Sequence, residues 1–313
     1  MFKNKLLQRK KNREMFSILD DQLHCVLDKG IGNRVIHLVS AMRVAENNGL
    51  ALHAWWINQG IGATYDQCFK PIEGVAIQSV ENKKALPSDL QDLQPGSWLW
   101  FLPEEIEPEH SSAYPDRKIW GRVLGVPRMG YKFFVQLTWI TPALQKLYQP
   151  FFQQIRFQDA VLSQIHSGWG GVDPSSVIGV HIRFAPDMKK KLMKGGLAEL
   201  TSLEVVLPIL EKYINSCGKS NVFVATDIPE VLSRVEDPLG SRLITQRKRE
   251  HGRGELKNII SALVDLGMLS QCSRLFLTCS SFGLTAWWLG GCVDALRLDS
   301  LYVEGDIEKG VSL

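Results

Sequence analysis

The chain has 313 residues, of which 45% are hydrophobic and 22% are charged, and its formal net charge is +3. This composition is typical of a globular protein, and the length allows about two domains and a core that needs no disulfide framework. A net charge this small does not indicate a dedicated nucleic-acid binder.

The N-terminal segment MFKNKLLQRKKNR is basic. It is interpreted as a solvated arm, with RNA binding through these charges as an alternative. No apolar run of ~18 residues occurs anywhere, and none follows the basic residues, so neither a membrane span nor a secretory signal is expected. The cysteines lack CxxC or zinc spacing, so buried reduced thiols and a cytoplasmic location are expected. They are Cys25, Cys68, Cys217, Cys272, Cys279 and Cys292.

The first half opens with a clear strand–helix–strand pattern. Residues 23–27 are predicted to be a strand and 28–33 a glycine-containing turn. From Arg34 onward apolar residues recur at helical spacing, until Asn-Asn-Gly at 47–49 ends the helix. Residues 50–57 form the next predicted strand. Such a βαβ unit makes its two strands parallel.

The middle of the chain has a weaker pattern between residues 60 and 135, with one strand expected at 97–102. Residues 142–166 are expected to be helical, with a break near Pro150. Residues 168–176, GWGGVDPSS, are rich in glycine, proline and serine and indicate a linker.

The second half alternates strands and helices. The expected strands are 177–182, 221–225, 242–245, 274–278 and 293–298. The expected helices are 203–214 with an interruption at Pro208, 229–235, 255–269 and 283–289. This alternation predicts a parallel sheet with helices on both faces. We therefore expect an α/β protein with two Rossmann-like domains, residues 1–170 and 171–313, that face a central cleft.

Ligands of open α/β sheets bind beyond the carboxyl ends of the strands, and the turn DKGIGNR, residues 28–34, lies at such an end. Gly30 and Gly32 allow close approach of the backbone to a ligand. A helix that starts at Asn33 would present N–H groups to an anion such as a diphosphate. The third glycine of a dinucleotide fingerprint is missing, so a tight turn with an Asn cap is the alternative.

The predicted strand VIGVHI contains His181 near its end and is followed by Arg183. Because side chains alternate along a strand, these two cationic groups are expected on one face. An arginine at the end of a buried strand needs an anionic partner, and a guanidinium fits phosphate oxygens in a bidentate manner. A bound phosphate is one interpretation. An internal ion pair with Asp227 or Asp265 is the other.

Two later segments also follow strands. Thr226 and Asp227 are explained by a helix cap, with a ligand contact as the alternative. Ser280 and Ser281 begin a helix, where hydroxyl and N–H groups suit phosphate or sugar hydroxyls. Asp265 lies in an otherwise apolar helix and needs polar partners if it is buried. Alternatively, this carboxylate faces solvent and the serines only cap the helix.

The sequence contains, in this order, the motifs GxGN, HxR and ATD-P, a helix with an internal aspartate and an SS turn. This series resembles the motifs of the fucosyltransferase superfamily. This superfamily includes bacterial and mammalian α-1,6-fucosyltransferases and protein O-fucosyltransferases. The resemblance is best over residues 22–57 and 177–291. It implies a GT-B fold and inverting transfer from GDP-fucose without a metal ion or other cofactor. The sequence correspondingly has no DxD pair, HExxH or Walker A motif.

The resemblance also implies roles for individual residues. Arg183 is the expected catalytic residue, because the matching arginine grips the β-phosphate and helps GDP to leave. Asn33 is expected near the diphosphate and fucose, and Asp265 at the guanine pocket. The residues expected to bind the donor are Gly32, Asn33, His181, Arg183, Asp227, Asp265, Ser280, Ser281 and Phe282.

The resemblance has departures. Phe184 stands where many α-1,6 members have a second arginine, which the O-fucosyltransferase branch also lacks. Residues 60–140, where acceptor recognition is expected, show no match. Asp66, Asp187 and Glu199 are candidates for the general base.

The expected partners are a nucleotide-sugar donor and a glycan acceptor, with no nucleic acid and no membrane. Two alternatives remain on the same fold. One is a transferase that uses another nucleotide sugar, and the other is a non-catalytic protein that binds nucleotides or glycans.

Overall fold

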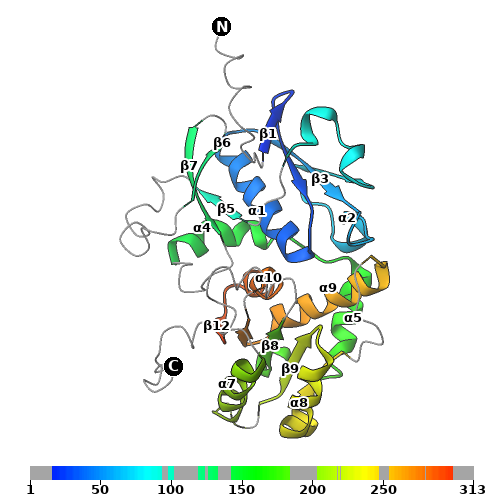
Figure 1. The fold of residues 1–313 in the computed structure, drawn as a ribbon, viewed down its shortest axis with the longest axis vertical. Helices are drawn as coiled ribbons and strands as arrows, with labels where there is room; N and C mark the ends of the chain where they lie inside the picture. Colours follow the sequence, from blue (N-terminus) through cyan, green and yellow to red (C-terminus); the bar gives the residue numbers. More distant parts are fainter. Residues whose placement is uncertain are drawn as a thin grey trace.

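The computed structural model shows a mixed α/β protein (Figure 1). It describes residues 16–93, 98–101, 119–123, 126–132, 142–183, 203–216, 218, 220–246, 254–278 and 280–298. Within these ranges the strands form a four-stranded, a three-stranded and a five-stranded sheet.

The four-stranded sheet comes from the N-terminal part and has the order β1-β2-β3-β4. Its strands are β1 (Phe16–Leu19), β2 (Gln22–Leu27), β3 (Ala51–Ile57) and β4 (Val75–Val80). β1 pairs with β2 antiparallel, whereas β2, β3 and β4 are parallel. The predicted parallel pair is therefore confirmed. β4 was not predicted, because this half-buried edge strand mixes small, polar and apolar residues and gives no clear apolar pattern.

Helix α1 (Ile31–Asn47) connects β2 to β3 and is buried along most of its length. It contacts β2 and β3, and also β5, α4 and α10, so it is surrounded by other elements. Most of its side chains are therefore buried, including the polar ones of Arg34, His37 and Ser40. The other face of the sheet is covered by two 3₁₀ turns, Lys83–Ala85 and Ser88–Leu90, which follow the short helix α2 (Tyr65–Cys68).

The three-stranded sheet is antiparallel and has the order β5-β7-β6. Its strands are β5 (Trp98–Phe101), β6 (Ile119–Val123) and β7 (Val126–Lys132), of which only β5 was predicted. The helices α4 (Pro142–Phe152) and α5 (Asp159–Gly168) follow. Pro150 lies inside α4, and the predicted break comes directly after that helix.

The five-stranded sheet is parallel throughout and has the order β10-β9-β8-β11-β12. Its strands are β8 (Ile178–Ile182), β9 (Val222–Thr226), β10 (Leu243–Ile244), β11 (Arg274–Leu277) and β12 (Asp294–Arg297). If these five strands are numbered in chain order, their order across the sheet is 3-2-1-4-5. This is the doubly wound arrangement, and its switch point lies between β8 and β11. The predicted parallel sheet is confirmed.

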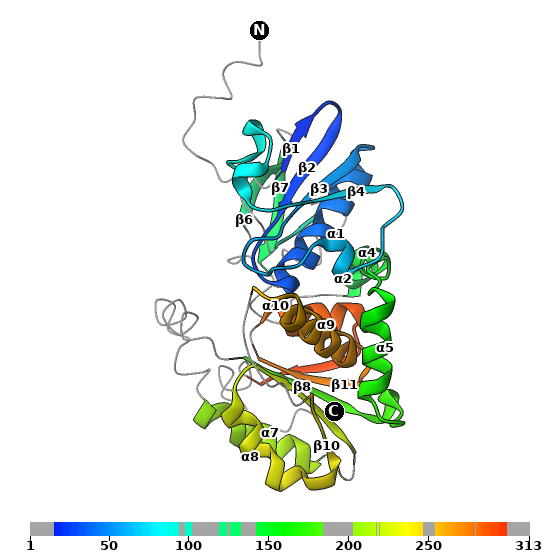
Figure 2. The ribbon, with the colours of Figure 1, turned by 90° about the vertical axis from the view of Figure 1, so that its right-hand side faces the viewer.

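Helices cover both faces of this sheet (Figure 2). α7 (Leu203–Ser216) and α8 (Pro229–Leu239) lie on one face, and α9 (Leu256–Gln271) and α10 (Ser281–Leu289) lie on the face toward the N-terminal part. Short 3₁₀ turns occupy Pro174–Ser176 and Gly240–Arg242. The predicted interruption at Pro208 is wrong, because α7 continues through it. The buried side chains of Val206, Leu207 and Leu210 offset the lost backbone hydrogen bond.

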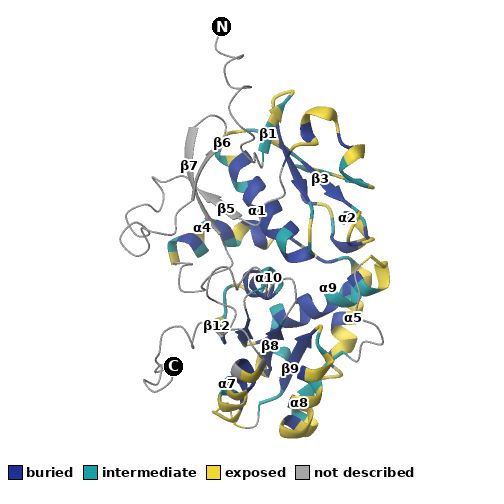
Figure 3. Cartoon of the chain, in the orientation of Figure 1, coloured by how far each residue is buried: buried dark blue, intermediate teal, exposed yellow. Residues whose placement is uncertain are grey.

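One apolar cluster joins the two larger sheets. It contains buried residues of β2, β3 and α1 together with residues of α4, α5, α9 and α10. Figure 3 shows α1, α9 and α10 as largely buried helices between the sheets.

The cysteines of the described residues are free thiols. Cys25, Cys68 and Cys272 are buried as predicted, and Cys292 is half-buried. Burial raises the pKa of each of these thiols. Cys217 and Cys279 lie outside the described residues, and the boundary near residue 170 stays a prediction.

Candidate functional site

The switch point of the five-stranded sheet brings the ends of β8 and β11 together. The backbone N–H of Arg183 donates to Oγ1 of Thr278 at 3.0 Å, and the N–H of Thr278 donates to the carbonyl of His181 at 3.1 Å. Thr278 is buried and follows β11 directly. These bonds fix the residues that leave the two strands at the position where doubly wound sheets bind ligands.

His181 faces α10. Its side chain is buried, and its ring stacks on Phe282 with centroids 5.1 Å apart and an interplanar angle of 28°. Gly283 provides the space, because a Cβ atom there would lie 2.9 Å from Nδ1 of His181. The structure therefore brings His181 and Phe282 together, two residues that are 101 positions apart in the sequence.

Arg183 lies just beyond the end of β8. Its Nε is 3.9 Å from Oδ2 of Asp227, and the two side chains are 27% and 51% exposed. An ion pair this long and this exposed contributes about 0–1 kcal/mol to stability. Asp227, one of the two internal partners considered for Arg183, therefore forms a long ion pair with it, and this pair does not bury the guanidinium.

Helix α10 is capped by its own sequence. Ser280 is the N-cap residue, and its Oγ accepts the N–H of Phe282 at 3.2 Å. Oγ1 of Thr285 donates to the carbonyl of Ser281 at 2.7 Å and is 3.2 Å from the carbonyl of Gly32 in α1. The capping interpretation of the serines is therefore confirmed for Ser280, and Thr285 joins this helix to α1.

Helix α1 starts at Ile31, so the predicted start at Asn33 is wrong by two residues. Glycine residues tolerate both turn and helix, and the pattern alone did not locate the boundary. Gly30 is the N-cap residue and gives no side-chain hydrogen bond. Asn33 therefore lies in the first turn, and its Oδ1 is buried without a hydrogen-bond partner in the described part of the chain.

The first turns of α1 and α10 meet backbone to backbone. A Cβ atom at Gly32 would lie 2.5 Å from the carbonyl oxygen of Ser281 and 2.7 Å from the nitrogen of Phe282. Neither helix has an acidic residue in its first turn. Two helix N-termini, each with a partial positive charge, therefore lie side by side, and Arg183 follows a strand end that contacts one of them. This arrangement favours an anionic ligand.

Two predicted carboxylates have different surroundings. Asp265 is buried in α9, so the solvent-exposed interpretation of this residue is wrong. Asp227 is exposed, and the hydroxyl of the neighbouring Thr226 accepts the N–H of Ile228 at 3.1 Å. Of the candidate general bases, Asp66 is exposed in α2, whereas Asp187 and Glu199 lie outside the described residues.

Arg34 was not recognised from the sequence. Its side chain is completely buried and donates to three backbone carbonyls around the start of α1. The available signal was a charged residue at the start of a helix whose apolar residues recur at helical spacing. That signal does not distinguish a buried arginine from one at the solvent-exposed end of a helix.

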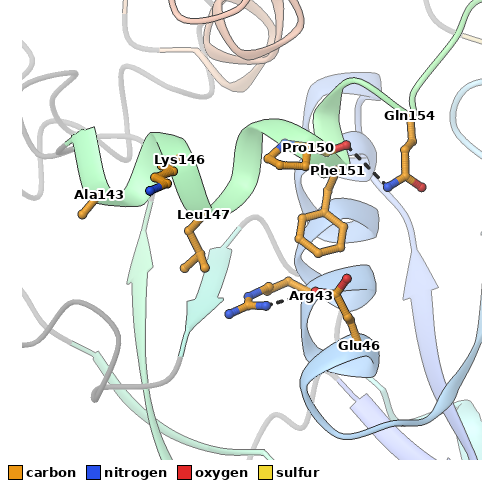
Figure 4. Close-up of a pocket in the computed structure, with 8 residues that line it drawn as sticks. All are labelled: Arg43, Glu46, Ala143, Lys146, Leu147, Pro150, Phe151 and Gln154. Carbon is orange, nitrogen blue, oxygen red and sulfur yellow. Dashed lines mark hydrogen bonds and ion pairs between the residues drawn. The ribbon is translucent and has the colours of Figure 1, made fainter.

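A separate cavity of about 440 Å³ lies between α1 and α4 (Figure 4). Leu147 and Phe151 of α4 point toward Arg43 of α1, which pairs with Glu46 at 3.0 Å. Arg43 is ten residues beyond Asn33, or about 15 Å along the helix. The cavity is therefore distinct from the strand ends described above.

The described residues contain no group of three or more His, Cys, Asp or Glu side chains that could hold a metal ion. No helix among them is long and apolar enough to cross a membrane.

No protein-family model and no curated protein matches the chain. Among solved structures, POFUT1 in complex with GDP is similar with a TM-score of 0.53 and 12% identity, over 90% of this chain and 99% of that chain. NodZ alpha-1,6-fucosyltransferase soaked with GDP-fucose has a TM-score of 0.50 and 18% identity, over 85% of this chain and 92% of that chain. Fucosyltransferase NodZ from Bradyrhizobium has a TM-score of 0.50 and 17% identity, over 84% of this chain and 92% of that chain. The chain therefore has a fucosyltransferase-like fold, as the sequence predicted.

Proposed function

We propose that this protein is a glycosyltransferase that moves fucose from GDP-fucose to a hydroxyl group of a glycan or related acceptor. The observation that carries the proposal is the meeting of the first turns of α1 and α10 beside the end of β8, where Arg183 lies. Proteins of similar fold have been solved with GDP and with GDP-fucose. In this proposal the two larger sheets belong to the two domains of a GT-B enzyme.

The donor would lie at the switch point of the five-stranded sheet. Its diphosphate would accept hydrogen bonds from the N–H groups of the two first turns, including those near Gly32, Ser280 and Ser281. Arg183 would exchange its exposed pair with Asp227 for the β-phosphate, which is a bidentate partner. His181 and Phe282 would form a wall of the nucleotide site, and Asp265 would order the guanine pocket.

The reaction is a displacement at C1 of fucose. The acceptor oxygen forms a bond to C1 from the face opposite GDP, while the bond between C1 and the β-phosphate oxygen breaks. The electron pair leaves with GDP, and the acceptor proton passes to a general base. Negative charge grows on the diphosphate in the transition state, so Arg183 would stabilise it more strongly there than in the bound donor. No metal ion or other cofactor is required in this proposal.

Titration calorimetry with GDP and GDP-fucose, with and without EDTA, tests the proposal. We expect the wild type to bind GDP in EDTA, and Arg183→Ala to lose binding and roughly 10²–10³-fold in the rate of transfer. Arg274→Ala is the matched control, because Arg274 lies at the other end of the same sheet and pairs with Asp294 at 2.9 Å. This variant is expected to retain GDP binding.

Each other outcome has a distinct meaning. A folded wild type that does not bind GDP refutes the proposal. Binding that requires a divalent cation refutes metal independence. GDP binding without turnover of any nucleotide sugar identifies a non-catalytic binding protein, and turnover of a different nucleotide sugar changes the donor.

A further inference from the structure

Arg34 carries a positive charge that is completely removed from solvent. Its Nη1 donates to the carbonyls of Leu27 at 2.8 Å and Ile57 at 2.6 Å, and its Nε donates to the carbonyl of Lys29 at 2.7 Å. Its guanidinium lies 4.6 Å from the ring centroid of Trp56, and Nη2 is 3.9 Å from Oδ1 of Asp28. Burial lowers the pKa of Arg34 to about 10, so it remains protonated at neutral pH.

A buried charge of this kind is a poor source of stability. The guanidinium loses its hydration, and an apolar side chain of similar volume is often as stable or more stable at such a position. The carboxylate of the half-buried Asp28 is too distant for a hydrogen bond to Nη2. The hydrogen bonds of Arg34 therefore point to a role in fixing geometry.

The three acceptors surround the start of α1. Leu27 ends β2, Ile57 ends the neighbouring β3, and Lys29 lies in the turn between β2 and α1. Lys29 has φ of +73°, a left-handed conformation that is unfavourable for a residue with a side chain. The bond from Nε of Arg34 to its carbonyl holds the turn in this conformation. The backbone N–H of Arg34 also donates to the carbonyl of Gly30 at 3.2 Å and closes the first helical turn.

The part of the chain that Arg34 holds belongs to the candidate site. It contains Gly32, which packs on the backbone of Ser281 and Phe282, and Asn33, whose Oδ1 is buried without a partner in the described ranges. No side chain caps this helix start, unlike the start of α10. Its position depends on tertiary hydrogen bonds, and Arg34 supplies three of them.

We propose that Arg34 is a positioning residue for the transfer reaction. By holding the ends of β2 and β3 and the intervening turn together, it sets the position of Asn33 and of the first-turn N–H groups of α1 relative to the donor. This inference rests on the proposed function. It predicts that changes at Arg34 reduce turnover more than they reduce the affinity for GDP, because α10 and Arg183 supply the other contacts to the diphosphate.

The test compares Arg34→Met and Arg34→Lys with Arg43→Met and Arg43→Lys. Arg43 is on the same helix, nine residues or about 13 Å further on, and its side chain is 12% exposed. Three quantities are measured for each variant. They are the Kd of GDP, the kcat of donor hydrolysis (GDP-fucose and water giving GDP and fucose) per folded molecule, and amide hydrogen exchange in peptides that cover residues 28–35.

The Arg34 variants are expected to lose at least about tenfold in kcat, because small misplacements at a reacting centre are costly, while the Kd of GDP changes less than about threefold. Amide exchange over residues 28–35 should rise at least about tenfold in both Arg34 variants and stay unchanged in both Arg43 variants. If Arg34→Met does not fold, Arg34→Lys, which keeps the charge but loses the planar fork, decides the question.

Two results would overturn the inference. One is an unchanged kcat per folded molecule in the Arg34 variants, which indicates a purely structural residue. The other is unchanged exchange over residues 28–35, which shows that Arg34 does not hold the turn. If the wild type neither binds GDP nor hydrolyses the donor, the proposed function fails. In that case the exchange measurement still determines whether Arg34 holds this turn.

Discussion

The two helix starts that meet at the candidate site are held in different ways. α10 is capped by Ser280, whose Oγ accepts the backbone N–H of Phe282. α1 begins at Gly30 without a side-chain cap, after a lysine in a left-handed conformation, and depends on the buried Arg34. One start is specified by adjacent residues, whereas the other is specified by contacts with β2, β3 and α10.

This difference has a physical reason. A capping residue satisfies the N–H groups of its own helix, so those groups are less available to a ligand. An uncapped start leaves them available, but its position must then be fixed by other parts of the molecule. The start of α1 therefore lacks the local stabilisation of a side-chain cap and depends on tertiary contacts. Three substitutions test this difference between the helix starts and the stability of the surrounding fold, from the largest expected effect to the smallest.

The largest effect is expected from Gly32→Ala. Its Cβ atom would lie 2.5 Å from the backbone carbonyl oxygen of Ser281, and neither backbone can move without separating the two helix starts. We expect a loss of about 3 kcal/mol in the free energy of unfolding, measured by urea denaturation. Gly30→Ala is the matched control, because a Cβ atom there meets nothing within 4 Å. Equal stability of the two variants would refute the close contact between α1 and α10.

A smaller effect is expected from Ser280→Ala. This change removes the side-chain acceptor for the N–H of Phe282 and should cost about 1 kcal/mol in the free energy of unfolding. Ser233→Ala provides the control, because Ser233 is exposed on α8 and only donates to the carbonyl of Glu230. If Ser280→Ala were as stable as this control, α10 would not depend on its cap and the contrast with α1 would disappear.

The smallest effect concerns pH and the N-terminal sheet. Burial and the neighbouring His53 lower the pKa of His24 below its ordinary value of 6.5, although a backbone hydrogen bond with Leu19 and the charge of Asp20 raise it in part. Nε1 of Trp55 donates to Nδ1 of His24 at 3.1 Å, which requires a neutral imidazole. Below about pH 6.5 the unfolded chain takes up a proton more readily than the folded one, so stability should fall as the pH drops further.

Thermal unfolding between about pH 7.5 and 5.5 measures this dependence, since histidines titrate in this range. His24→Asn should have a weaker dependence on pH than the wild type. His166→Asn, at an exposed position on α5, should retain the dependence of the wild type. If the melting temperature of all three proteins changed equally with pH, His24 would not titrate differently in the folded and unfolded states.

The sequence predicted the features that depend on near neighbours. The alternation of strands and helices in the second half predicted a parallel sheet, and the alternation along VIGVHI predicted that His181 and Arg183 share one face. It did not predict β4 or the continuous helix through Pro208, because their surroundings outweigh a weak or contrary local pattern.

Within the candidate site, the strand ends that carry polar residues could be predicted from the sequence, because a strand end and the turn after it are adjacent in the chain. Which of these ends meet depends on the tertiary packing. The approach of Gly32 to Ser281 and the stacking of His181 on Phe282 join residues that are far apart in sequence. The hydrogen bond from Arg34 to Ile57 likewise spans two strands, and such contacts depend on how sheets and helices pack rather than on local preference.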